Sequence, residues 1–122
     1  MAENIPQLAR FLALRHIWPT LINGWAATSA RESVPAAERL LAAGADRTDL
    51  VRVARSVAYE TAFALLYSIT AHGYDDEAPD APGWRLMETT PAGELTGRSL
   101  QALHEDLLSM DPSGQEGGDL SE

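Results

Sequence analysis

The stretch that decides the fold is residues 46–73, "DRTDLVRVARSVAYETAFALLYSITAHG", which has no proline, and no glycine before its last residue. Asp46 or Thr48 can cap its start, because short polar side chains accept hydrogen bonds from the first backbone N–H groups of a helix. Residues 57–69 are apolar nearly all round, which is typical of a buried helix. The sequence therefore predicts a central helix over Asp49–His72, roughly 36 Å long at 1.5 Å per residue.

The chain before this helix predicts three shorter helical stretches. A first helix is expected over Ile5–Trp18, capped by Asn4, because asparagine is among the preferred N-cap residues. Pro19 should then break or kink the chain, since its ring and missing N–H disrupt the preceding turn. A second helical run continues to Ser29, and Ser33–Gly44 carries the start and stop signals of a third, short helix.

The chain after the long helix changes character. Alternating side chains from Trp84 onwards and the turn signal Pro91-Ala92-Gly93 predict a short β-hairpin over residues 84–96. A last helix is expected over Arg98–Met110, where leucines recur at helical spacing. The final residues, 113–122, are small, polar and acidic, which predicts a flexible tail.

Together these elements predict an all-α fold, in which four to five helices form a bundle around the Asp49–His72 helix. The possible small β-hairpin is an insertion before the last helix. A chain of 122 residues has room for one hydrophobic core. We therefore expect a single helical domain over residues 1–112, followed by a flexible acidic tail over residues 113–122.

The composition excludes several function classes. The chain has no cysteine and a net charge of −9, and all nine basic residues are arginine. Residues 1–60 carry a net charge of +1 and residues 61–122 carry −10. Nucleic acids and anionic membranes attract basic surfaces, so neither is expected as a partner. The sequence shows neither signal-peptide features nor the roughly 20 apolar residues that span a bilayer, which favours a cytoplasmic protein.

No motif indicates a metal site, a cofactor or a catalytic group. The three histidines, His16, His72 and His104, lie on different predicted elements and match no zinc-binding spacing. The glycines form no phosphate-binding loop, because no lysine follows them. We therefore expect no metal and no cofactor, and favour a protein without enzymatic activity.

The acidic segment after the long helix is the first candidate site. Four acids and two prolines lie between a tyrosine and a tryptophan. One interpretation is a stiff, solvated connection, since runs of charge are usually solvated. The other is a docking site, in which aromatic side chains supply buried area and carboxylates steer a basic partner. The candidate partner-binding residues are Tyr74, Asp75, Asp76, Glu77, Asp80 and Trp84.

A polar stripe on the long helix is the second candidate site. Glu60 is the only acid between Asp49 and Asp75, and a carboxylate in apolar surroundings must be solvated, paired or protonated. One interpretation is an internal ion pair with Arg10 or Arg15. The other is a ligand-binding or catalytic pocket, whose candidate residues are Arg52, Arg55, Tyr59, Glu60 and Tyr67.

These observations lead to one prediction and two alternatives. The leading prediction is a non-enzymatic protein-binding module, of the immunity-protein or adaptor type, that presents its acidic C-terminal half to a basic protein surface. The first alternative is a small-molecule-binding or catalytic helical domain with a pocket at Glu60. The second is a homodimeric structural protein without a ligand, assembled through an apolar helix face.

Overall fold

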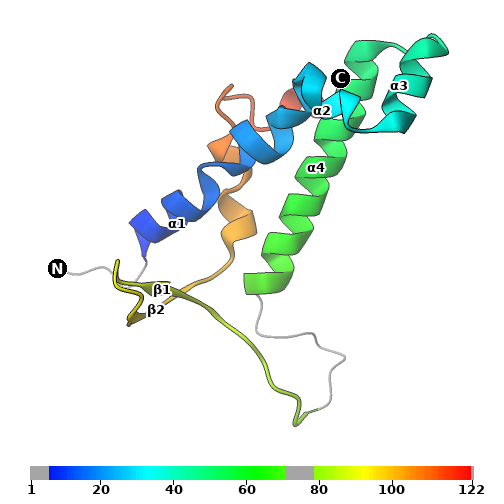
Figure 1. The fold of residues 1–122 in the computed structure, drawn as a ribbon. Coiled ribbons are helices and arrows are strands. Elements are labelled where there is room, and N and C mark those ends of the chain that lie inside the picture. The colour runs from blue at the N-terminus through cyan, green and yellow to red at the C-terminus, as the bar shows by residue number, and fades with distance from the viewer. Residues whose placement is uncertain (1–5, 71–78, 122) are drawn as a thin grey trace.

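The computed structural model describes residues 6–70 and 79–121 (Figure 1). Within them, the α-helices are α1 (Gln7–Leu14), α2 (Thr28–Glu32), α3 (Pro35–Ala42) and α4 (Arg47–Thr70), and the strands are β1 (Leu86–Thr89) and β2 (Leu95–Leu100). The remaining elements are a π-helix (Ile17–Ile22) and 3₁₀ turns over Asn23–Ala26, Leu103–Asp106, Leu108–Met110 and Gly118–Ser121. The structure is therefore mixed, with helices dominating and one two-stranded antiparallel sheet.

The predicted long helix is present as α4, whose described part covers 24 residues. Asp46 caps it, because the backbone N–H of Asp49 donates to Asp46 Oδ1 at 2.9 Å. Its surroundings differ from the prediction, however. The fully buried residues of α4 are two near its C-terminal end, Leu66 and Thr70, whereas Val57 is 60% exposed. α4 is therefore covered along one side rather than buried all round.

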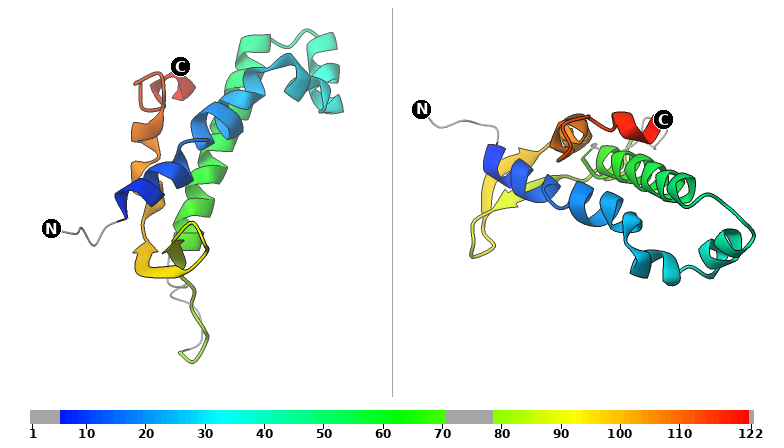
Figure 2. Two further views of the ribbon diagram at one scale, coloured as in Figure 1. Left: turned by 60° about the vertical axis from the view of Figure 1, so that its left-hand side comes forward. Right: turned by 90° about the horizontal axis from the view of Figure 1, so that it is seen from above.

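The prediction of an all-α bundle of four to five helices around a central helix is wrong. α1 and the π-helix run along one side of α4, and residues 100–110 lie beside both of them (Figures 1 and 2). α3 lies beside the start of α4, and the β-hairpin lies at the other end of the molecule. α1 and α3 have eight residues each, which is roughly 12 Å of helix. Neither is long enough to cover α4.

The β-hairpin is present, and it takes the place of the first turn of the predicted last helix. β1 pairs with β2 in an antiparallel ladder, with Leu86 opposite Leu100 and Thr89 opposite Leu95. Gly93 (φ +89°) lies in the turn, in a backbone conformation that glycine adopts without strain.

The prediction of a helix over Arg98–Met110 is wrong for a further reason. Ala102, the residue before the 3₁₀ turn Leu103–Asp106, has a left-handed backbone conformation (φ +52°), which interrupts a right-handed helix. Leu103 and Leu107 are nevertheless 1% and 0% exposed. The apolar spacing thus identified core residues correctly, although Leu103 begins a 3₁₀ turn and Leu107 lies between that turn and the next.

The core forms where the N-terminal run (residues 14–22), α4 and residues 100–107 meet. Trp18 is fully buried, its ring lies 5.6 Å from that of Tyr59, and its indole N–H donates to the carbonyl of Leu107 at 2.7 Å. The predicted irregularity at Pro19 is confirmed: the proline lies within the π-helix, whose wider turn tolerates its missing N–H. The buried apolar residues are Leu14, Ile17, Trp18, Ile22, Leu66, Leu100, Leu103 and Leu107.

The C-terminal segment, which the sequence analysis assigned to a flexible tail, folds back against α4 as far as the structure describes it. Its backbone is organised by Asp111, which is 6% exposed. The carboxylate accepts hydrogen bonds from the N–H and the hydroxyl of Ser113 and from the N–H of Gly117, all at 2.9 Å. Leu120 then packs against the core. The polar groups of this segment thus bond to one another.

The pKa of Asp111 reflects this arrangement. Burial raises the pKa, but the hydrogen bonds from Gly117 and Ser113 and the positive charge of Arg55 outweigh it, so the pKa lies below its ordinary value of 3.8. A carboxyl group of this kind stabilises the folded state above its unfolded pKa. That contribution is lost as the pH falls through the lower, folded pKa.

The role of Trp18 can be tested by Trp18→Phe, which leaves the Leu107 carbonyl without its partner in the core. We expect the free energy of unfolding, measured by urea denaturation, to fall by about 2–3 kcal/mol. Trp84→Phe is the matched control, because it also removes an indole N–H that bonds a carbonyl, that of Ser68. Trp84 is 41% exposed, so water can replace the bond and the loss should stay below about 1 kcal/mol. Equal losses would contradict the assignment.

Asp111→Asn tests the anchoring of the C-terminal segment. We expect a loss of roughly 1.5–3 kcal/mol at neutral pH, because a buried charged acceptor of three hydrogen bonds is removed. The difference from the unaltered protein should shrink below the ordinary pKa of 3.8, where the unfolded carboxyl is protonated. Urea denaturation at neutral pH and at about pH 3 measures both effects. The exposed Asp80→Asn variant should show neither, and a pH-independent loss in Asp111→Asn would contradict the mechanism.

Candidate functional site

The acidic segment is described in part. The candidate residues Tyr74, Asp75, Asp76 and Glu77 lie outside the described residues. Asp80 is exposed. Trp84 is also exposed, and its indole N–H donates to the carbonyl of Ser68 at 3.1 Å. The tryptophan is thereby held at the C-terminal end of α4, with part of its surface in contact with solvent.

Several acids of the C-terminal half are used inside the molecule. Asp106 accepts hydrogen bonds from the guanidinium of Arg10, and Asp119 forms an ion pair with Arg55 at 2.8 Å. Both arginines belong to the N-terminal half, 96 and 64 residues away along the chain. The charge asymmetry between the halves therefore serves in part to join them.

Glu88 of β1 is engaged in the same way within the hairpin. Its Oε1 accepts hydrogen bonds from the Thr96 hydroxyl and from Arg98 Nε, both at 2.8 Å. The Thr96 hydrogen bond is the largest influence and, with Arg98, holds the pKa of Glu88 below its ordinary value although burial opposes it. Among the described acids of this half, four are exposed and make no ion pair with a described residue: Asp80, Glu94, Glu105 and Glu116.

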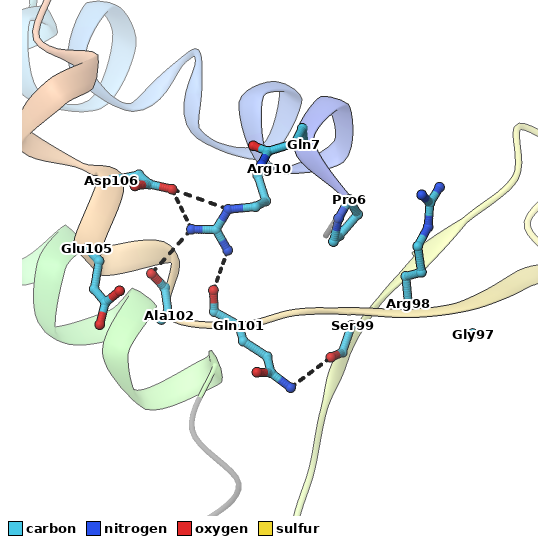
Figure 3. A pocket seen from close by; sticks show the side chains of 10 residues that line it. All are labelled: Pro6, Gln7, Arg10, Gly97, Arg98, Ser99, Gln101, Ala102, Glu105 and Asp106. Atoms are coloured by element: carbon cyan, nitrogen blue, oxygen red, sulfur yellow. Dashed lines mark hydrogen bonds and ion pairs between the residues drawn. The ribbon is translucent and has the colours of Figure 1, made fainter. Parts of the chain in front are cut away.

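An open cavity of about 650 Å³ lies between the start of α1 and β2 (Figure 3). Arg10 forms its inner wall and donates to Asp106 and to the backbone carbonyls of Gln101 and Ala102. The one hydroxyl in the lining, that of Ser99, accepts a hydrogen bond from Gln101 at 2.9 Å. Neither carboxylate of this lining, Glu105 or Asp106, makes a hydrogen bond to the Ser99 hydroxyl, so the geometry indicates a structural clamp rather than a catalytic centre.

The five candidate pocket residues on α4 do not form one pocket. Tyr59 and Glu60 line a cavity of about 220 Å³ together with Ser56 and Leu120. Tyr67 does not line it; its ring lies 5.0 Å from the ring of His104. Tyr59 packs instead towards the core, against Trp18 and Phe63.

The ion pairs expected for Glu60 are not formed either. Glu60 is exposed and makes no ion pair within the described part of the chain, and Arg10 pairs with Asp106 instead. Arg52 and Arg55 both contact Asp119, through its carbonyl and its carboxylate respectively. The arginines of the stripe thus hold the C-terminal segment, and Glu60 is a solvated carboxylate.

The feature that the sequence analysis missed is an apolar surface on α4, which we call the α4 face. At about 3.6 residues per turn its members lie on one side of the helix. Val53 and Val57 are 60% exposed and Leu65 is 58% exposed. The face consists of Val53, Val57, Thr61, Ala64 and Leu65, all exposed, and the charged residues Asp49 and Glu60 lie at its border. The sequence already showed that this stripe lacks charge, but that pattern is shared by buried helices.

The α4 face continues into an apolar pocket between α3 and the start of α4, beneath Trp25. Its volume is about 190 Å³. Every residue that lines it is apolar: Trp25, Val34, Ala36, Ala37, Leu40, Leu50, Val51 and Ala54. A pocket of this kind accepts an uncharged apolar group, since an apolar cavity of about 150 Å³ is known to hold benzene.

Comparisons with known proteins add no functional information. No family model, no curated protein and no solved structure matches the chain. In residues 6–70 and 79–121, no group of three or more histidine, aspartate or glutamate side chains is placed to hold a metal ion. In the same residues, no helix combines the length and apolar character that crossing a membrane requires.

Glu60→Gln tests whether this carboxylate is a solvated neighbour of Tyr59. Burial raises the pKa of Tyr59 above its ordinary value of 10.0, and the negative charge of Glu60 raises it further. We expect the variant to lower the Tyr59 pKa while leaving it above 10.0, because burial is the larger cause. The tyrosinate absorbance, compared with that of Tyr59→Phe, measures this pKa.

The same variant should change the free energy of unfolding by less than about 0.5 kcal/mol, as for most exposed positions. Glu38→Gln, on the exposed side of α3, is the control and should leave the Tyr59 pKa unchanged. A large loss of stability in Glu60→Gln would show instead that Glu60 has a partner in solution.

Proposed function

We propose that the protein is a non-enzymatic protein-binding module that docks the apolar side of a basic partner on the α4 face. The observation that carries the proposal is the exposure of this face, which has three large aliphatic side chains each more than half exposed. Contiguous apolar surface on a soluble protein is typical of a protein interaction site. The 24-residue helix also presents the face on a straight, rigid support.

The apolar pocket supports the same function. Binding energy in protein interfaces is concentrated in a few large side chains that fill pockets. The volume of about 190 Å³ beneath Trp25 suits one such side chain, and Leu40 at 49% exposure lies at its edge. The pocket lies beside Leu50 and Ala54, at the N-terminal end of the α4 face. A partner helix lying along α4 could therefore insert a leucine or an aromatic ring there.

The charge of the protein supports a basic partner. A net charge of −9 attracts a positively charged protein and repels a second copy of this chain. The exposed acids Asp80, Glu94 and Glu105 supply steering outside the apolar contact. The contact itself is then apolar, and the charge acts at longer range.

As the chain has no cysteine, we place this function in the reducing cytoplasm.

The proposal can be tested with a synthetic amphipathic helix of leucine and lysine as the probe. Val57→Asp places a charge in the middle of the α4 face, so we expect the dissociation constant for the probe to rise at least about tenfold. Leu95→Asp is the matched control, because it adds the same charge at a side chain 69% exposed in the hairpin. Its dissociation constant for the probe should stay within about twofold of that of the unaltered protein.

Tryptophan fluorescence, with Trp25 beside the pocket, reports the binding, and light scattering reports the size of the free protein. Equal affinities for Val57→Asp and Leu95→Asp would contradict the proposal, because binding would then be electrostatic alone. A free protein that is a dimer, and that Val57→Asp converts to a monomer, would also contradict it. That outcome would assign the α4 face to a second copy of the chain.

A further inference from the structure

A second cavity, of about 300 Å³, opens at the start of α4 and is lined by three arginines. Its lining residues are Ala26, Arg47, Thr48, Val51, Arg52, Arg55 and Asp119. The gathering of three guanidinium groups is unusual in a chain with nine basic residues and a net charge of −9. The cavity belongs neither to the α4 face nor to the pocket beneath Trp25, although Val51 borders both cavities.

Two of these arginines have acidic partners. Arg52 pairs with Asp49 at 3.2 Å, and its Nε donates to the carbonyl of Asp119, also at 3.2 Å. Arg55 donates to the carboxylate of Asp119 at 2.8 Å and to Asn23 Oδ1 at 3.0 Å. Each of these two arginines therefore has at least one acidic partner.

Arg47 is not matched in this way. It is exposed, and it forms no hydrogen bond or ion pair with any residue of the described ranges. Among the three arginines of this cavity, Arg47 is thus the one without a partner in the described ranges. Keeping it beside Arg52 and Arg55 is unfavourable by like-charge repulsion, and an anion in the cavity would relieve this.

We propose that this cavity binds a small ligand through an oxyanion group, a carboxylate or a phosphate. A guanidinium presents a planar fork of N–H donors, which matches the paired oxygens of both groups. The hydroxyl of Thr48, one residue along α4, is a second donor at the cavity wall. The site lies on the side of α4 that faces Asp119 and the C-terminal segment, and it shares Val51 with the pocket beneath Trp25.

The test uses the full chain and two probes, inorganic phosphate and acetate, titrated at constant ionic strength against chloride. Amide chemical shifts locate the binding, and we expect those of Ala26 and Thr48 to move with at least one probe. An anion held by one exposed guanidinium binds weakly, and we expect a dissociation constant on the order of 1–10 mM. Movement with acetate alone assigns a carboxylate ligand, and movement with phosphate alone assigns a phosphate.

Arg47→Gln should raise the dissociation constant at least about tenfold. Arg39→Gln is the matched control, because it removes the same charge from an exposed position on α3 and should change the constant by less than about twofold. The proposal is overturned if neither probe moves the two amide signals. It is also overturned if both variants weaken binding alike, because the anion would then respond only to the net charge.

Discussion

The buried indole of Trp18 is the contact on which the rest of the structure depends. It lies where the N-terminal run, α4 and the C-terminal segment meet, and its hydrogen bond to Leu107 joins residues 89 positions apart. Gly117 also approaches this ring: a Cβ at that position would lie 3.5 Å from the indole and 3.1 Å from the side chain of Leu108. One side chain thus fixes the position of two segments against α4.

The long-range arginine–carboxylate pairs form a second set of constraints around this core. The pairs Arg10–Asp106 and Arg55–Asp119 hold the C-terminal part of the chain at two places. The two arginines lie on either side of Trp18 in the sequence. The arginine side chains are 14% and 17% exposed, so these pairs are less screened than pairs at the surface. The acid of the C-terminal half is therefore divided between structural pairs and carboxylates that remain in solvent.

A small core with a long helix along one side leaves α4 two different surfaces. The side towards the C-terminal segment carries Arg52, Arg55 and the oxyanion cavity that we propose. The other side is the apolar α4 face. In a bundle of longer helices both sides would be buried, and neither would be available to a ligand or a partner. The two proposed sites thus follow from the same property, which is that the helices beside α4 are short.

Local features were predicted well because they depend on neighbouring residues. Asp46 caps α4, Pro19 disturbs the helix that contains it, and Gly93 lies in a hairpin turn; each follows from the backbone chemistry of one or two residues. The candidate sites were predicted less well. The stripe containing Glu60 is present on α4, but the partners of its arginines come from Asp119, more than 60 residues away.

By itself, the sequence determined that α1, α3 and α4 are helical, that Pro19 disturbs the N-terminal run, and that Leu100, Leu103 and Leu107 are apolar anchors. The tertiary structure alone decided which side of α4 is covered, that Leu103 and Leu107 reach the core from a stretch of 3₁₀ turns rather than from an α-helix, and that Asp111 orders the C-terminal segment. The physical reason is that an uncharged helix surface has the same sequence whether it is buried or exposed. Only the length and position of the neighbouring segments distinguish the two.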